Sequence, residues 1–221
     1  MNTNRTTLWI RWTAANALSE LLGLGATFAA IGLLVSRIDT GHITGILLAF
    51  GLTVASGAIE ATLVGLAQRW AMQPWFPQIG RFAWWRATLV GALLGYVMGY
   101  LPSTLMSMGQ SATQSPQAEP PQWLTLLLAA FLGAAAGAVL SFAQWLVLRG
   151  KVRRTRLWIP ANMLAWACGM PVIFQGMDLA FRQPALWQSA LVVGAAILVA
   201  GAVVGAIHGR FLIYMAEDKI D

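Results

Sequence analysis

Long apolar runs separated by short polar segments fill most of this chain. An α-helix needs about 20 predominantly apolar residues to cross the hydrocarbon core of a bilayer, and six runs reach that length. They cover residues 8–36, 43–68, 82–106, 123–148, 157–181 and 186–212. The pattern therefore predicts an all-α integral membrane protein, with six transmembrane helices in a single membrane domain over residues 1–221.

Basic residues gather on one side of this pattern. Of the 14 Lys and Arg residues, 12 lie near the two termini or flank the second and fourth connections, and only Arg37 and Arg182 lie in the other connections. Because cytoplasmic loops of membrane proteins are enriched in Lys and Arg, we expect both termini in the cytoplasm (N-in/C-in). The third connection, Ser107–Gln122, contains no basic residue and is rich in Pro, Ser and Gln, which predicts a flexible external linker.

The densest basic segment, which we term the basic rim, joins the fourth and fifth runs. It consists of Arg149, Lys151, Arg153, Arg154 and Arg156. Basic residues beside an anionic membrane surface contribute about 1 kcal/mol of attraction each. We expect this rim to bind anionic lipids at the cytoplasmic face, or a partner subunit.

Tryptophans concentrate at the same boundary. The set is Trp9, Trp12, Trp70, Trp75, Trp84, Trp85, Trp145 and Trp158. Trp123 and Trp187 mark the opposite boundary. Indole rings are enriched at the headgroup level of membranes, so we expect these side chains to lie there.

Two sequence patterns recur along the chain and predict three tandem helical hairpins, over residues of about 8–70, 82–149 and 156–212. In the odd runs a tryptophan is followed four residues later by Asn16, Thr88 or Asn162. In the even runs small residues four apart lead to Gln68, to Gln144, and to either His208 or Leu212. Small residues let helices approach closely in lipid. The predicted packing positions are Gly23, Gly57, Ala61, Gly95, Gly133, Gly137, Ser141, Gly169, Gly201 and Gly205.

The segment Gly133–Arg149, which ends in Gln-Trp-Leu-Val-Leu-Arg, and the small-residue stripe that follows Trp158 resemble a group of bacterial polytopic membrane proteins. The resemblance is clearest over Gly133–Gly169. The first hairpin departs from it, because Arg69 and Trp70 follow Gln68 where the pattern has Trp and Leu. The resemblance implies a multi-pass protein of a bacterial inner membrane and no particular activity.

Two acidic residues, Glu20 and Glu60, lie inside the apolar runs at a similar depth, about 12–14 Å from the basic boundary. A carboxyl inside a membrane is a functional-site hypothesis by default. One interpretation is a proton or cation site, with Asn16 and Ser19 assisting. The other is a pair of protonated carboxyls that hydrogen-bond between helices, which burial favours. Neither glutamate recurs in the other hairpins, which favours the second interpretation.

Composition and motifs argue against several classes of function. The chain is 58% hydrophobic and 10% charged, and it has a single cysteine, Cys168, which we expect to be a small core residue. The segments around Ser56 and His208 invite comparison with intramembrane serine proteases, but Val54 replaces the first glycine of the serine motif and the serine and histidine are expected at different depths. We expect no enzyme activity, no cofactor, no metal site and no nucleic-acid partner.

The recurring features are packing features, so we expect a non-catalytic structural or accessory subunit of a membrane assembly. The alternative is a small ion or proton channel or carrier that uses Glu20 and Glu60. At the outer end of the fifth run, Asp178 and Arg182 are four residues apart and predict a local ion pair.

The predicted orientation can be tested by labelling. In intact cells, an impermeant thiol reagent should label Ser115→Cys in the external linker and leave Thr155→Cys in the basic rim unlabelled. The reverse pattern would show that the assigned orientation is wrong.

Overall fold

The computed structural model describes residues 5–109 and 120–216, and over these residues the protein is all-helical. The long helices are α1 (Arg5–Val35), α2 (Ile43–Met72), α3 (Arg81–Gly109), α4 (Gln122–Leu148), α5 (Trp158–Phe181) and α6 (Leu186–Met215). A single 3₁₀ turn, Thr155–Leu157, leads into α5. All six predicted runs are therefore helical. Residues 110–119 of the predicted external linker lie outside the described residues.

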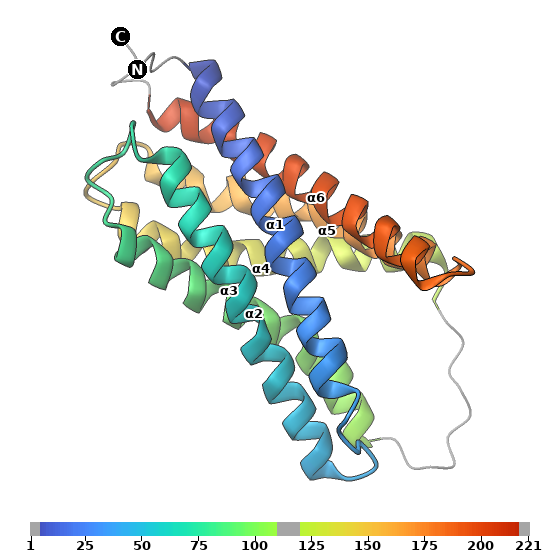
Figure 1. Ribbon diagram of the computed structural model, residues 1–221. Helices are drawn as coiled ribbons and strands as arrows, with labels where there is room; N and C mark the ends of the chain where they lie inside the picture. The colour runs from blue at the N-terminus through green and yellow to red at the C-terminus, as the bar shows by residue number, and fades with distance from the viewer. Residues whose placement is uncertain (1–4, 110–119, 217–221) are drawn as a thin grey trace.

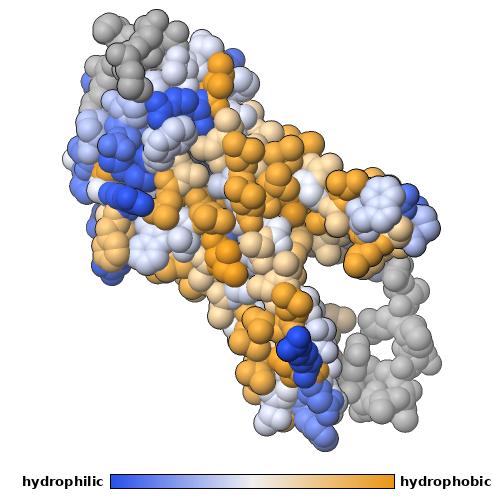
Figure 2. Space-filling model, viewed as in Figure 1, coloured by the Kyte–Doolittle hydropathy of each residue, from blue (hydrophilic) through white to orange (hydrophobic). Residues whose placement is uncertain are grey.

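All six helices are long and apolar enough to cross a membrane. Their apolar side chains are not confined to the interior: large residues such as Leu22, Phe131 and Leu191 are mostly exposed. Figure 2 shows an apolar band around the middle of the molecule, with hydrophilic residues gathered toward its ends. Such a surface suits lipid and not water, so the protein is a multi-pass membrane protein.

The helices form a closed ring in sequence order (Figure 1). Each helix packs against the next one in the chain, and α1 packs against α6 to close the ring. The start of α1 and the end of α6 lie at one end of the molecule, together with the α2–α3 and α4–α5 connections. At the opposite end the tips of α1 and α2 diverge from those of α5 and α6. We call the end where α1 starts and α6 ends the basic end, because it carries the basic rim.

A buried aromatic cluster fills the ring at the basic end. Trp12, Trp84 and Trp158 are fully buried there, and the Trp158 ring centre lies 5.9 Å from that of Trp12 and 6.0 Å from that of Trp84. The α2–α3 connection folds onto this cluster and buries Trp75 and Phe76. Trp12, Trp75, Trp84 and Trp158 were expected from the sequence to lie at the headgroup level. They do lie at the basic end, but their side chains are buried in the core, because a ring of helices leaves an axial space that large side chains fill.

Small residues bring neighbouring helices into contact at every interface of the ring. A Cβ atom added to one glycine at each interface would come very close to the neighbouring helix. It would lie 2.6–2.9 Å from an atom of that helix at Gly23 (α1–α2), Gly57 (α2–α3), Gly91 (α3–α4), Gly137 (α4–α5), Gly169 (α5–α6) and Gly201 (α6–α1). At Gly23, Gly91, Gly137 and Gly201 the atom that the Cβ would meet belongs to the neighbouring backbone, so a side chain there would push the helices apart; at Gly57 and Gly169 it belongs to the side chains of Tyr96 and Val204.

The other predicted packing positions lie at the same interfaces, with one looser case. Ala61 and Ser141 are buried, and Gly133 and Gly205 contact the backbones of α5 and α1. A Cβ on Gly95 would lie 3.7 Å from Ala136, an ordinary van der Waals distance, so this glycine does not set the α3–α4 spacing.

Two predictions about individual residues have opposite outcomes. Cys168 is exposed on the surface of the bundle, so the expectation that it packs in the core is wrong. Its position on α5 faces away from both neighbouring helices. The ion pair of Asp178 with Arg182 is confirmed, with 2.8 Å between the carboxylate and guanidinium groups.

We predict that Gly137→Leu destabilises the protein, because the new side chain collides with the backbone carbonyl of Asn162, 2.7 Å from the added Cβ. Overpacking of this kind costs about 1–3 kcal/mol. The measurement is the thermal unfolding midpoint in detergent. Gly51→Leu is the matched control, because nothing lies within 4 Å of a Cβ at Gly51. Equal midpoints for the two variants would contradict the interface.

Candidate functional site

The two membrane-embedded glutamates meet at the interface of α1 and α2. Glu20 is 3% exposed and Glu60 is 9% exposed. Their approach depends on glycines: a Cβ on Gly23, three residues after Glu20, would lie 2.8 Å from the Cα of Glu60. On the other side, a Cβ on Gly201 of α6 would lie 2.9 Å from the Cβ of Glu20. The small-residue faces that hold the ring together therefore also bring the carboxyls together.

The two carboxyl groups are near enough to interact electrostatically across the α1–α2 interface. Ionised carboxylates are acceptors only, so a hydrogen bond between them requires a proton on one of the two groups. The hydroxyl of Tyr96 on α3 donates a hydrogen bond to Oε2 of Glu60. Oε2 of Glu20 has no hydrogen-bond partner among the described residues. The arrangement is a buried pair of carboxyls with one hydroxyl donor.

Tyr96 is the member of this site that the sequence analysis missed. Its ring packs on the open face of Gly57, where an added Cβ would lie 2.7 Å from the ring. It also stacks on Tyr100, with 6.0 Å between ring centres. A buried tyrosine hydroxyl normally has a hydrogen-bond partner, so a tyrosine within an apolar helix was the available signal.

Asn16 and Ser19, the two predicted assistants of the acid pair, bond elsewhere. The Ser19 hydroxyl donates to the backbone carbonyl of Asn16 at 3.3 Å. The Asn16 amide donates to the carbonyl of Trp12 at 2.8 Å, and its Oδ1 accepts from Nε2 of Gln68 at 2.9 Å. Of the four predicted site residues, the structure therefore brings together only Glu20 and Glu60.

Gln68 and Gln144 each bridge neighbouring hairpins. Oε1 of Gln68 accepts the indole N–H of Trp84 at 3.3 Å, while its amide nitrogen holds Asn16. In the same way, Oε1 of Gln144 accepts the indole N–H of Trp158 at 2.9 Å. Its amide nitrogen donates to the Thr88 hydroxyl at 3.0 Å. We call these two sets of bonds the amide–indole bridges.

The side chains of the predicted basic rim are all exposed at the basic end. Arg154 lies over the Tyr214 ring, 4.1 Å from its centre, and Arg149 lies over that of Trp145 at 5.4 Å. Nε2 of Gln78 donates to the carbonyl of Lys151 at 3.1 Å, which ties the α2–α3 connection to the rim. These contacts hold the rim against the ends of α4 and α6 and against the α2–α3 connection.

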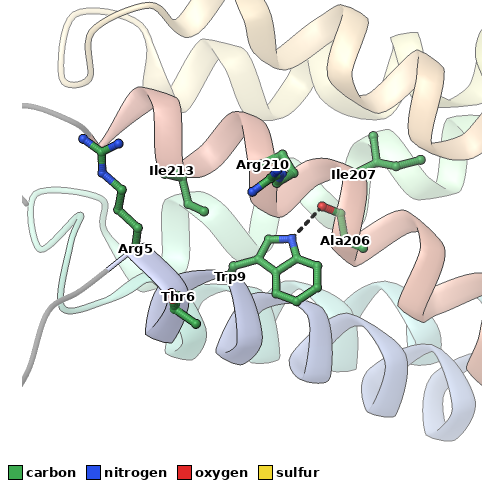
Figure 3. A pocket seen from close by; sticks show the side chains of 7 residues that line it. All are labelled: Arg5, Thr6, Trp9, Ala206, Ile207, Arg210 and Ile213. Atoms are coloured by element: carbon green, nitrogen blue, oxygen red, sulfur yellow. Dashed lines mark hydrogen bonds between the residues drawn. The ribbon is translucent and has the colours of Figure 1, made fainter.

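A groove of about 700 Å³ lies at the same end, between the first turns of α1 and the last turns of α6 (Figure 3). Its wall is mostly apolar, with an arginine from each helix beside it. The lining residues are Arg5, Thr6, Trp9, Ala206, Ile207, Arg210 and Ile213. The indole N–H of Trp9 donates to the carbonyl of Ala206 at 3.0 Å and thereby fixes the ring across the seam.

Comparisons with protein-family models, with curated proteins and with solved structures find no match to this chain. The resemblance of the Gly133–Gly169 segment to bacterial polytopic membrane proteins thus rests on its own residues. Within residues 5–109 and 120–216, no group of three or more His, Cys, Asp or Glu side chains is placed to hold a metal ion. The fold establishes the class of protein, a helical multi-pass membrane protein.

We predict that Tyr96→Phe weakens the acid site without dismantling it. Loss of the donor leaves an acceptor of Glu60 unpaired, which costs about 1–3 kcal/mol of stability. The infrared carbonyl-stretch band of the protonated carboxyl, assigned by its loss in Glu60→Gln, should shift in Tyr96→Phe. Tyr100→Phe, which leaves this bond intact, is the control, and an unshifted band in Tyr96→Phe would argue against the bond.

Proposed function

We propose that this protein is a non-catalytic structural or accessory subunit of a bacterial inner-membrane assembly. In this proposal both termini are cytoplasmic, and the chain consists of three tandem hairpin repeats. The observation that carries the proposal is the use of the recurring residues. Recurring small positions form helix contacts, and recurring polar positions form the amide–indole bridges. These residues hold the helices together, and few polar groups remain along the axis to bind a transported ion.

The repeat proposal is supported by corresponding contacts in successive hairpins. Gln68 and Gln144 are 76 residues apart, and each accepts from the tryptophan that begins the next odd helix. Similar residues with similar partners at a fixed interval are what tandem units with a common orientation produce.

The non-catalytic part of the proposal is supported by the positions of the two residues that a serine hydrolase would use. The Ser56 hydroxyl donates to the carbonyl of Thr53 at 2.7 Å. His208 packs against the ring of Trp158 in the aromatic cluster of the basic end, with 5.3 Å between ring centres. Ser56 lies more than three helical turns before Gln68, the α2 residue that accepts from Trp84 of that cluster, so a nucleophile–base hydrogen bond is out of reach.

A second candidate function, a small proton or cation channel or carrier, is favoured by the contact between Glu20 and Glu60. A carboxyl pair that shares a proton inside a membrane is the kind of group that proton pathways use. Against this candidate, the axis at the basic end is filled by Trp12, Trp84 and Trp158.

A single pair of measurements separates the two functions. Reconstituted wild-type protein should show no proton or cation flux across liposomes. The double variant Glu20→Gln, Glu60→Gln should retain the native assembly, measured as a complex heavier than the 23.8 kDa chain after mild extraction. Glutamine replaces protonated carboxyls at modest cost because it keeps a donor and an acceptor. Flux that the double variant abolishes would reverse the assignment, and a solitary wild-type chain would contradict the subunit role.

We also propose that anionic lipids are partners of the basic end. The rim supplies exposed positive charge, and the groove supplies arginines beside an apolar wall that suits an acyl chain. Each basic residue contributes about 1 kcal/mol of attraction to an anionic membrane surface, so several together contribute substantially to the free energy of lipid binding.

We predict that replacing Lys151, Arg153 and Arg154 by Gln lowers the amount of anionic lipid that co-purifies, measured by mass spectrometry. Arg210→Gln should lower it separately at the groove. Arg182→Gln, at the opposite end of the molecule, is the control and should have no effect. Recovery that is unchanged in the first two variants would mean that these charges serve topology alone.

A further inference from the structure

The helices α1, α5 and α6 meet at the basic end without an amide–indole bridge. The position that corresponds to Gln68 and Gln144 is occupied by His208, three residues after the small residue Gly205. Its imidazole lies between two indoles, with ring-centre distances of 6.5 Å to Trp12 and 5.3 Å to Trp158. His208 thus occupies the third bridging place of the ring.

The side chains around this place contain unpaired polar atoms. Nε1 of Trp12, Oδ1 of Asn162 and both ring nitrogens of His208 have no hydrogen-bond partner among the described residues. Each of the three side chains is at most 1% exposed, and Asn162 lies one helical turn after Trp158, whose ring packs on His208. Buried polar groups in native proteins are nearly always hydrogen-bonded, so these four atoms require an explanation.

The two existing bridges show which bonds are missing. In the first bridge, Asn16 donates to the carbonyl of Trp12 and leaves its Oδ1 to accept from Gln68. Asn162 makes the equivalent bond to the carbonyl of Trp158 at 2.8 Å, which leaves its Oδ1 in need of a donor. The indole N–H of Trp12 correspondingly needs an acceptor on α6.

A neutral imidazole supplies one donor and one acceptor, which are the two roles that each glutamine amide fills. We propose that His208, in its neutral form, is the third bridge: one ring nitrogen accepts the indole N–H of Trp12, and the other donates to Oδ1 of Asn162. In this arrangement the ring, which packs against both indoles, turns one nitrogen toward each of these two groups. The bridge then closes the seam between the first and the last hairpin.

This third bridge differs from the other two because it can take up a proton. A protonated imidazole has two donors and no acceptor, so Trp12 would lose its partner and a positive charge would be buried against indole rings. An unfolded chain binds this proton with an ordinary imidazole pKa of about 6.5. A fold that requires the neutral ring therefore loses stability as the pH falls below that value. The α1–α6 seam is the acid-sensitive joint of the ring.

The three helices that meet here carry other titratable groups, and several of these have contacts of their own. Those on the helices that pack together here are Arg5, Arg11, Glu20, Cys168, Asp178, Arg210 and Tyr214. Glu20 contacts Glu60, Asp178 pairs with Arg182, and Arg11 lies 4.5 Å from the Trp70 ring centre. Because the acid pair also titrates, the pH effect of His208 has to be measured as a difference between variants.

The test exchanges the bridging residues. His208→Gln should unfold at the wild-type temperature in detergent at about pH 7.5, above the ordinary imidazole pKa, because an amide makes the same two bonds. His208→Leu should unfold several degrees lower. Gln144→His and Gln144→Leu form the matched pair at the second bridge. At this pH Gln144→His should unfold at the wild-type temperature, and Gln144→Leu should unfold several degrees lower. Equal losses for His208→Gln and His208→Leu would overturn the proposal.

Acidification supplies a second test, which compares how far the unfolding midpoint of each variant changes with pH. Between about pH 7.5 and pH 5, a range that brackets the ordinary imidazole pKa, the unfolding midpoint should fall further for the wild type than for His208→Gln, and further for Gln144→His than for the wild type. Identical pH profiles would overturn the acid-sensitive joint.

Nitrogen NMR of the histidine ring gives a direct readout. The chain has two histidines, so His42→Gln, at an exposed position, leaves His208 as the single signal. The bridge predicts one protonated and one unprotonated ring nitrogen at neutral pH, and an indole N–H signal of Trp12 that moves in His208→Leu. Two protonated ring nitrogens at neutral pH, or a Trp12 signal that does not move, would count against the bridge.

Discussion

Close approach of helix backbones in a medium without water is the constraint on which this structure depends. Lipid provides no hydrophobic force to drive helices together, so association relies on packing contacts and interhelical hydrogen bonds. Here each of the six interfaces contains a glycine whose Cβ would collide with the neighbouring helix. The ring closes because this condition also holds between α6 and α1, where Gly201 and Gly205 lie against Ala17 and Asn16.

The polar side chains follow from that close approach. Once the helices are this near, amides such as Gln68 and Gln144 can reach across two interfaces and hold the tryptophans in the centre. The indoles in turn fill an axial space that small residues leave open. At the basic end, packing and hydrogen bonding thus support one another, and the α2–α3 connection covers the result with Trp75 and Phe76.

The acid pair takes no part in the amide–indole bridges. Glu20 and Glu60 belong to the first hairpin and the corresponding positions of the other hairpins carry no carboxyl. Tyr96, from the second hairpin, stabilises the pair through Glu60.

The sequence by itself determined the helical class, the six spans and the small-residue interfaces, because hydrophobic length and small-residue spacing are local properties of a helix. It also placed Glu20 and Glu60 at one depth, since the rise per residue is constant. Only the tertiary structure decided that Tyr96 hydrogen-bonds to Glu60 and that Cys168 faces outward. It also decided that Asn16 hydrogen-bonds to Gln68 and not to the acid pair. Likewise, the burial of Trp12, Trp84 and Trp158 depended on how the ring closes. These outcomes depend on the rotation of each helix about its axis, which contacts with neighbouring helices set and a linear pattern does not encode.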